Sequence, residues 1–350
     1  AGEVCCVSFQ VVSRTRGHRV GIKVERENLS VEVDLSSSDE LLIKYQARQG
    51  GCQTEVIKVV ERVTPELKEE WRTIITGGDE LSQFSQQRAM ALLDRLALGF
   101  GNYVSKDLNQ LGDWLINSRE ITNFTWDISD LSLTYFAHAV SLSTNCTLED
   151  AIRWVREPLE DPELQEHLRQ KQLTSAHRVL ADDSPRFGRR LVWYAMVRAT
   201  KPGLVIETGI DKGLGSVLLC AAVKRNSSEG HTGRYLGTDI EPSAGYLLDG
   251  TYKEHGSIAY GDSIESLQKL DEPIDLFIND SDHSHEYEAR EYETVEHLLH
   301  DESVILGDNA HTSMSLAQFA AKTKRLFTMV PEYPENHWYR GCGVGIAYRR

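Results

Sequence analysis

The run from Leu204 to Ser216 constrains the fold of this chain more than any other segment. It opens with three apolar residues and Glu207, which is typical of a short buried strand. Its glycines are Gly209, Gly213 and Gly215. Glycine lets a backbone turn sharply and lets a ligand approach closely, so the run predicts a strand, a tight turn and a helix beginning near Ser216. We expect a nucleotide-like cofactor to bind where this strand passes into the helix.

The glycine spacing separates two kinds of cofactor site. Gly209 and Gly213 are separated by three residues, so the run is not the dinucleotide fingerprint G-x-G-x-x-G. It resembles the acidic-x-Gly-x-x-x-Gly first motif of class I S-adenosylmethionine (SAM) methyltransferases. That resemblance implies SAM binding by Glu207, Thr208, Gly209, Gly213, Gly215 and Ser216. Taken alone, the motif is also compatible with a plain structural turn.

Strands and helices alternate from about Arg189 onward. The predicted strands are 204–207, 234–239, 258–260, 274–278 and 303–306, and the predicted helices are 189–200, 216–224, 287–299 and 315–324. Such alternation predicts an α/β fold with a doubly wound, Rossmann-like parallel sheet. Two closing strands, near 327–330 and 343–348, are joined by a non-helical loop. They favour an antiparallel C-terminal hairpin, the usual ending of the class I methyltransferase fold.

The N-terminal half has a different pattern. Segments 4–12, 19–25 and 29–34 alternate apolar and polar residues, which predicts an antiparallel meander. From about Thr64 the period becomes helical, and Thr147–Asp150 resembles a capping box. We therefore predict an auxiliary domain over 1–180, with a β meander over about 1–60 and helices over about 64–180. The methyltransferase domain is predicted over 181–350.

The ends of the second and third predicted strands carry polar residues. Asp239 ends the second strand, where an acidic residue can accept both ribose hydroxyls of the cofactor. By the same resemblance, Asp262 and Ser263 lie beside the adenine. For each position the alternative is a turn residue without a ligand.

Charged side chains crowd the end of the fourth predicted strand. They are Asp280, Asp282, His283 and His285. Grouping carboxylates is costly unless a cation or a substrate offsets their charge. The segment resembles the Asp-x-Asp-His run of SAM-dependent small-molecule methyltransferases. Asp282 is expected to cap the following helix.

The fifth predicted strand ends in Asp308 and Asn309. This pair resembles the metal-binding pair of the catechol and caffeoyl-CoA O-methyltransferases, in which Asp280 corresponds to the third ligand. Such oxygen ligands suit Mg²⁺, which lowers the pKa of a hydroxyl and orients it. His283 is close enough in sequence to Asp280 to serve as general base, so we assign His283 and Asp280 as catalytic.

The whole constellation most closely resembles metal-dependent O-methyltransferases that act on macrolide deoxysugars. In those enzymes the second pair is usually two acidic residues, and Asn309 departs from that pattern. The departure lowers the charge of the site and bears on whether the metal is required.

The composition of the chain limits the kinds of partner that we expect it to bind. The formal net charge of -15 argues against nucleic acid and favours a small-molecule acceptor. No apolar run reaches the length of a membrane helix, and none resembles a secretion signal. The six cysteines show no metal or disulfide spacing, so we expect a cytoplasmic protein. Because the chain has two predicted domains, an acidic charge and no anchor, we expect it to assemble through its extra domain into a homo-oligomer. Segments 176–188 and 331–339 are expected to close the pocket. The aromatic residues of segment 331–339 either stack on the substrate or pack the loop.

Two other classes of function remain open at this point. One is a metal-independent methyltransferase acting on nitrogen or carbon, in which the aspartates and His283 serve only as base and hydrogen-bond partners. The other is a non-catalytic SAM-fold protein or a nicotinamide-dependent enzyme. The missing dinucleotide spacing and the polar cluster at Asp280 and Asp308 disfavour this last class.

Overall fold

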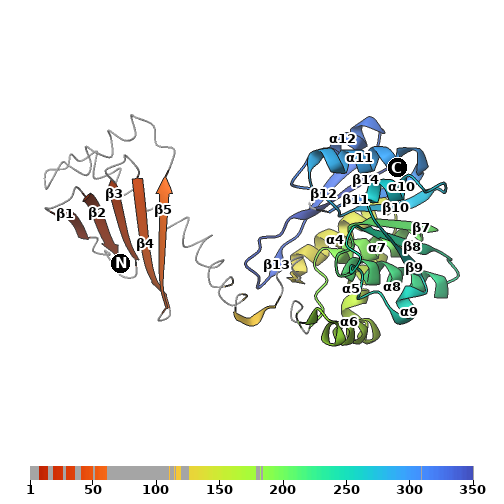
Figure 1. The fold of residues 1–350 in the computed structure, drawn as a ribbon, viewed down its shortest axis with the longest axis horizontal. Coiled ribbons are helices and arrows are strands. Elements are labelled where there is room, and N and C mark those ends of the chain that lie inside the picture. The colour runs from red at the N-terminus through yellow and green to blue at the C-terminus, as the bar shows by residue number, and fades with distance from the viewer. Residues whose placement is uncertain are drawn as a thin grey trace. The chain divides into compact units, whose positions relative to one another are not determined.

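The computed structural model describes the backbone of five N-terminal strands and, with side chains, most of the chain after residue 125. Outside the strands the described residues are 110, 114, 116–119, 126–178, 182, 184–308 and 310–349. Contacts divide the chain into two compact units, Ala1–Lys106 and Asp107–Arg350. Figure 1 labels the elements of both units.

The first unit contains a five-stranded antiparallel sheet whose strands pair in chain order. The strands are β1 (Ser8–Arg14), β2 (Arg19–Arg26), β3 (Leu29–Leu35), β4 (Leu41–Gln49) and β5 (Cys52–Val60). In the register, Val20 of β2 lies opposite Leu35 of β3. The first three strands overlap the segments predicted from the alternation of residues. Residues 4–7, and most of the predicted helical segment before residue 126, lie outside the described residues.

Three helices lie within the described residues 126–178 of the second unit. They are α4 (Asp130–Thr144), α5 (Leu148–Glu160) and α6 (Pro162–Thr174). The Thr147 side chain accepts a hydrogen bond from the Asp150 amide at 3.1 Å, as the capping sequence predicted. Among the described helices, none combines the length and the apolar composition needed to cross a bilayer.

These helices bear on the division predicted near residue 180. Phe136 of α4 and Trp154 of α5 belong to the same buried cluster as Trp193, and both helices pack against the helix that contains Trp193. The contacts thus group residues 130–174 with the C-terminal unit and divide the chain at residue 106. The sequence pattern changes at Arg189 because strand-helix alternation begins there, whereas the core of this unit extends further back along the chain.

The second unit is built on a seven-stranded sheet with the order β12-β14-β11-β10-β7-β8-β9. The strands are β7 (Leu204–Thr208), β8 (Arg234–Asp239), β9 (Gly256–Tyr260), β10 (Ile274–Asn279), β11 (Leu299–Gly307), β12 (Leu326–Pro331) and β14 (Gly343–Tyr348). Strands β7 to β11 pair in parallel, whereas β14 pairs antiparallel with both β11 and β12. The predicted α/β Rossmann-like sheet with an antiparallel C-terminal hairpin is confirmed.

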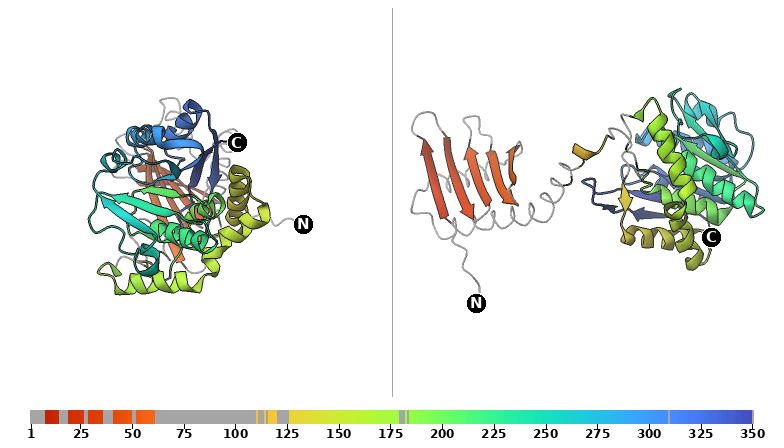
Figure 2. Two further views of the ribbon diagram at one scale, coloured as in Figure 1. Left: turned by 90° about the vertical axis from the view of Figure 1, so that its right-hand side faces the viewer. Right: turned by 90° about the horizontal axis from the view of Figure 1, so that it is seen from below.

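Helices cover both faces of this sheet. They are α7 (Arg190–Thr200), α8 (Leu214–Ser228), α9 (Gly250–Lys253), α10 (Ser263–Leu267), α11 (His285–Val295), the 3-10 helix η4 (Glu296–Leu298) and α12 (Ser315–Lys322). Along β10, Leu276 and Ile278 belong to the cluster with α7 and α8, whereas Phe277 belongs to the cluster with α11 and α12. Figures 1 and 2 show the sheet between these helices. Burial on both faces explains why residues 276–278 of this strand are all apolar.

The order of the strands indicates where a ligand site lies. From β7 the chain builds outward through β8 and β9, and it then returns to the other side of β7 to add β10 and β11. Ligands of doubly wound sheets bind beyond the carboxyl ends of the strands at such a reversal. The residues at or directly after these ends include Gly209, Asp239, Asp280 and Asp308.

Candidate active site

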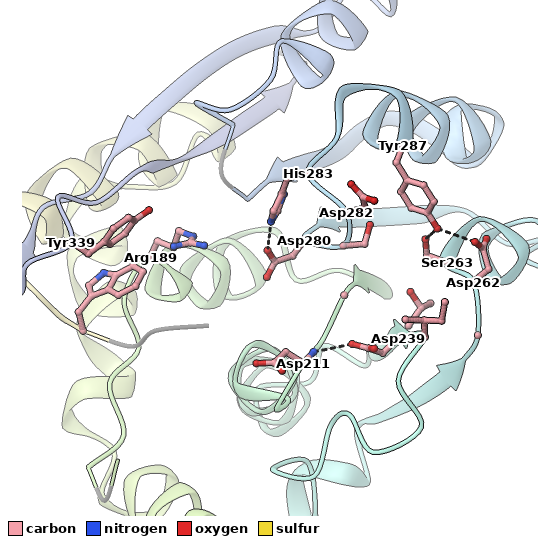
Figure 3. Close-up of a pocket in the computed structure, with 16 residues that line it drawn as sticks. Arg189, Asp211, Asp239, Asp262, Ser263, Asp280, Asp282, His283, Tyr287 and Tyr339 are labelled. Atoms are coloured by element: carbon pink, nitrogen blue, oxygen red, sulfur yellow. Dashed lines mark hydrogen bonds and ion pairs between the residues drawn. The ribbon is translucent and has the colours of Figure 1, made fainter. Parts of the chain in front are cut away.

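A cavity of about 740 Å³ opens at the carboxyl ends of the strands (Figure 3). Its lining includes the predicted residues Gly209, Asp239, Asp262, Ser263, Asp280 and His283. Residues on its wall that were not predicted as site residues include Trp126, Arg189, Asp211, Tyr287 and Tyr339. The cavity therefore brings together residues from the ends of several strands and from two distant loops.

Gly209 forms the floor of the turn after β7. Its φ is +76°, and a β-carbon there would collide with the backbone carbonyl of Asp280. Only glycine allows this approach without strain. The Asp239 carboxylate accepts hydrogen bonds from the amides of Ile210 at 3.0 Å and Asp211 at 2.9 Å. Asp239 thus fastens the turn to β8 while it lines the cavity.

The remaining residues of the predicted motif lie behind this wall, away from the cavity lining. Glu207 is buried and accepts hydrogen bonds from the hydroxyls of Ser216, at 3.1 Å, and Tyr235. Burial raises the pKa of Glu207 to about 7. Gly215 leaves room for this carboxylate, which a β-carbon would overlap. Thr208 and Gly213 are also buried, so these residues support the turn from behind.

A polar network supports the cavity lining at Asp262 and Ser263. The Tyr287 hydroxyl donates to Asp262 at 3.1 Å and lies 2.9 Å from the Ser263 hydroxyl. Beneath them, the buried Glu291 carboxylate accepts hydrogen bonds from four side chains: Thr208, Ser263, Asn279 and Ser281. Glu291 thereby joins β7, β10 and α10 to α11. The sequence offered no signal for it beyond a helical position.

Asp280, His283 and Asp308 converge at the edge of the cavity. Each offers one possible ligand atom, and these atoms lie within 4.8 Å of one another. His283 Nε2 is 3.7 Å from Asp280 Oδ1. Burial, together with the nearby Asp308 carboxylate, raises the pKa of Asp280 well above its ordinary value. Asn309, the other predicted metal ligand, lies outside the described residues.

Arg189 contacts the same cluster from the residue before α7. Its Nε and Nη2 atoms donate to the two carboxylate oxygens of Asp308. Its Nη1 atom donates to Glu332 at 3.2 Å. Burial alone opposes ionisation of Asp308, but the Arg189 guanidinium outweighs it and holds the pKa of Asp308 well below its ordinary value. Arg190 Nη2 lies 3.9 Å from Asp280 Oδ2.

A buried carboxylate lies behind His283. His283 Nδ1 is 3.5 Å from Glu288 Oε1, and Glu288 in turn accepts a hydrogen bond from the Ser313 hydroxyl. The contact with Glu288 raises the pKa of His283 against the effect of its burial. A carboxylate on the Nδ1 side favours a proton on that nitrogen, and Nε2 faces Asp280.

Aromatic side chains form another part of the wall. The rings of Trp126 and Tyr339 lie 4.7 Å apart, and the Arg189 guanidinium lies 5.5 Å from the centre of the Trp126 ring. The Trp126 indole donates to Glu332 at 3.0 Å. Trp338 instead packs against Trp114 at 5.5 Å. Within segment 331–339, Tyr339 therefore lines the cavity and Trp338 packs against another part of the chain, while stacking of an aromatic ring on substrate stays a prediction.

A comparison with protein families agrees with this geometry. Residues 206–310 match a family described as "Methyltransferase domain". No curated protein matches the chain. Similar solved structures include an O-methyltransferase from Bacillus cereus in complex with S-adenosylhomocysteine (SAH), at 16% identity and a TM-score of 0.43, covering 56% of this chain and 96% of that one. Another is the O-methyltransferase TomG from Streptomyces achromogenes, involved in tomaymycin synthesis, at 17% identity and a TM-score of 0.41, covering 56% and 97%.

The family match spans the glycine turn, Asp239, Asp262, Asp280 and Asp308. These are the residues that the fold gathers at the carboxyl ends of its parallel strands. Residues 206–310 of this chain form a methyltransferase domain.

Proposed function

We propose that this domain transfers the methyl group of SAM to a hydroxyl oxygen of a small-molecule acceptor. The observation that carries the proposal is the His283–Glu288 pair at the wall of the cavity. His283 Nε2 takes the proton of the acceptor hydroxyl while the oxygen forms a bond to the methyl carbon. The carbon–sulfur bond breaks and leaves its electron pair on sulfur, so that SAH is the second product. Asp280, 3.7 Å from Nε2, stabilises the protonated imidazole.

The cavity fits SAM at the glycine turn. The turn lies tight against the backbone of Asp280, which a β-carbon at Gly209 would meet, and Asp239, Asp262 and Ser263 offer polar atoms along the same wall. We propose that Asp239 accepts from the ribose hydroxyls and that Asp262 and Ser263 lie beside the adenine. Glu207, Thr208, Gly213, Gly215 and Ser216 would act from behind, by fixing the turn that these contacts require.

The acidic cluster fits a divalent cation by the type and the separation of its donors. We propose that Asp280 and Asp308 hold Mg²⁺, with Asn309 as a further oxygen ligand. Bound there, the cation would lower the pKa of the acceptor hydroxyl and orient it. Mg²⁺ prefers oxygen ligands to imidazole, which leaves His283 available as the base.

The acceptor side of the cavity combines aromatic and polar groups. Trp126 and Tyr339 present rings, and Arg189 presents a guanidinium. Such a wall suits a hydroxylated ring, and we propose a sugar of a natural product as the acceptor. The net charge of -15 favours an uncharged molecule over nucleic acid. We further propose that the protein works as a homo-oligomer in the cytoplasm.

One observation favours a second candidate, a metal-independent methyltransferase on nitrogen or carbon. The Asp308 carboxylate already has a cationic partner in Arg189. A site that is charge-balanced in this way can hold an acceptor without a metal ion. In this version Asp280 and His283 serve as base and hydrogen-bond partners.

A turnover assay separates the two candidates. The protein, freed of metal with EDTA, is given SAM and matched sugar acceptors that carry either a hydroxyl or an amine at the same carbon. Methylated product is measured by mass spectrometry with and without added Mg²⁺. The proposal expects an O-methyl product that appears only with Mg²⁺. Full O-methylation without metal contradicts only the proposed role of Mg²⁺. Methylation of only the amine contradicts the proposed reaction itself.

A further inference from the structure

Arg189 is the most firmly anchored charge at the acceptor side of the cavity. The residue is only 5% exposed, and its guanidinium donates to both oxygens of Asp308 and to Glu332. Trp126 fixes it further, because the indole lies 5.5 Å from the guanidinium and donates to the same Glu332. Asp308 itself is fully buried. The pair is therefore a built-in ion pair and not a solvent-exposed contact.

The same carboxylate belongs to the cluster that suits a divalent cation. A metal bound by Asp280 and Asp308 would share Asp308 with a guanidinium that already compensates its charge. Like charges at such short range repel strongly where water is excluded. A second guanidinium, that of Arg190, lies 3.9 Å from the other carboxylate of the cluster, Asp280.

We infer that Arg189 is an internal counter-cation that competes with a divalent metal for Asp308 and weakens metal binding at this site. The inference rests on the proposed metal site and deepens it by naming the residue that sets its affinity. The alternative is that Arg189 strengthens metal binding by orienting Asp308. Hydrogen bonds from outside a metal site often orient a carboxylate ligand, and their loss then weakens metal binding. The two roles predict changes of opposite sign.

Titration of Mn²⁺ into the full-length protein tests the inference without any acceptor. Affinity is measured by isothermal titration calorimetry, and free Mn²⁺ is measured by electron paramagnetic resonance. Arg189→Gln removes the charge, whereas Arg189→Lys keeps it and serves as the matched control. We expect Arg189→Gln to bind Mn²⁺ at least about tenfold more tightly than the wild type. We expect Arg189→Lys, which keeps the charge but loses the bidentate contact, to bind Mn²⁺ less tightly than Arg189→Gln.

Equal or weaker Mn²⁺ binding by Arg189→Gln overturns the inference, as does an absence of binding in the wild type and both variants. Asp308→Asn should abolish the gain when it is added to Arg189→Gln. If Arg189→Gln does not fold, the double variant Arg189→Gln/Glu332→Gln replaces it, because it removes one charge of each sign from the buried site. Methyl transfer is assayed separately, so failure of the proposed reaction leaves this comparison interpretable.

Discussion

At the scale of single residues, Glu207 couples the cofactor turn to pH. Burial raises its folded-state pKa to about 7 from an ordinary value of 4.5. Between these two values the unfolded chain has released the proton while the folded chain still holds it. Stability therefore falls as pH rises through this window, by up to about 3 kcal/mol.

Glu207→Gln imitates the protonated form, so we expect it to flatten the dependence of stability on pH between about 5 and 7. Urea unfolding at several pH values measures this slope in the wild type and the variant. An unchanged slope in Glu207→Gln would show that Glu207 is ionised throughout the window and that the assigned pKa is wrong.

Alanine substitutions at two glycines with positive φ distinguish the cost of backbone strain from the cost of a steric clash. Gly230 has φ +92° and open space around it, whereas a β-carbon at Gly209 would meet the backbone of Asp280. We expect Gly230→Ala to cost about 1–2 kcal/mol of stability. Gly209→Ala should cost about 1–3 kcal/mol more through the steric overlap, and it should also weaken SAH binding. Thermal unfolding and calorimetric titration of SAH measure the two effects, and similar values for both variants would contradict the assigned role of Gly209.

At the scale of elements, helices α4 to α6 complete the core of the methyltransferase unit. Phe136, Trp154 and Leu164 are buried in one cluster with α7 and α8. A fragment covering 181–350 would expose the apolar surface that these helices cover, at a cost of about 1.5–3 kcal/mol for each large side chain left without its partner. We expect the fragment 107–350 to fold and to bind SAH, and the fragment 181–350 to aggregate. Cooperative unfolding and SAH binding by 181–350 would instead support the division near residue 180.

The strand ends explain how much of the site could be predicted. Gly209, Asp239, Asp262, Ser263 and Asp280 could be placed together because the carboxyl ends of parallel strands meet at one edge of a sheet. His283 followed from its short sequence distance to Asp280. These predictions needed only the order of the strands and the local turn sequences.

The remaining site residues depend on tertiary packing. Arg189 and Asp308 are 119 residues apart, and Trp126 and Glu332 are 206 apart. No local pattern marks such partners, because their meeting depends on how α7 and the loop after β12 pack over the sheet. The buried position of Glu207 was also missed, since an acidic strand end looks the same in sequence whether it faces a ligand or the core.

At the scale of the whole molecule, the account holds that the cavity performs base-assisted methyl transfer from SAM. His283 and His285 provide a matched pair of histidines separated by one residue. His283 lines the cavity, whereas His285 is absent from the cavity lining and its Nδ1 lies 2.8 Å from the Ser315 hydroxyl. The single-turnover rate of methyl transfer compares the two directly.

We expect His283→Ala to retain SAH binding while its single-turnover rate falls by about 10²–10⁴-fold, the usual effect of removing a positioned base. His285→Ala should retain both binding and a rate close to that of the wild type. A His283→Ala protein that transfers methyl groups as fast as His285→Ala would contradict the account.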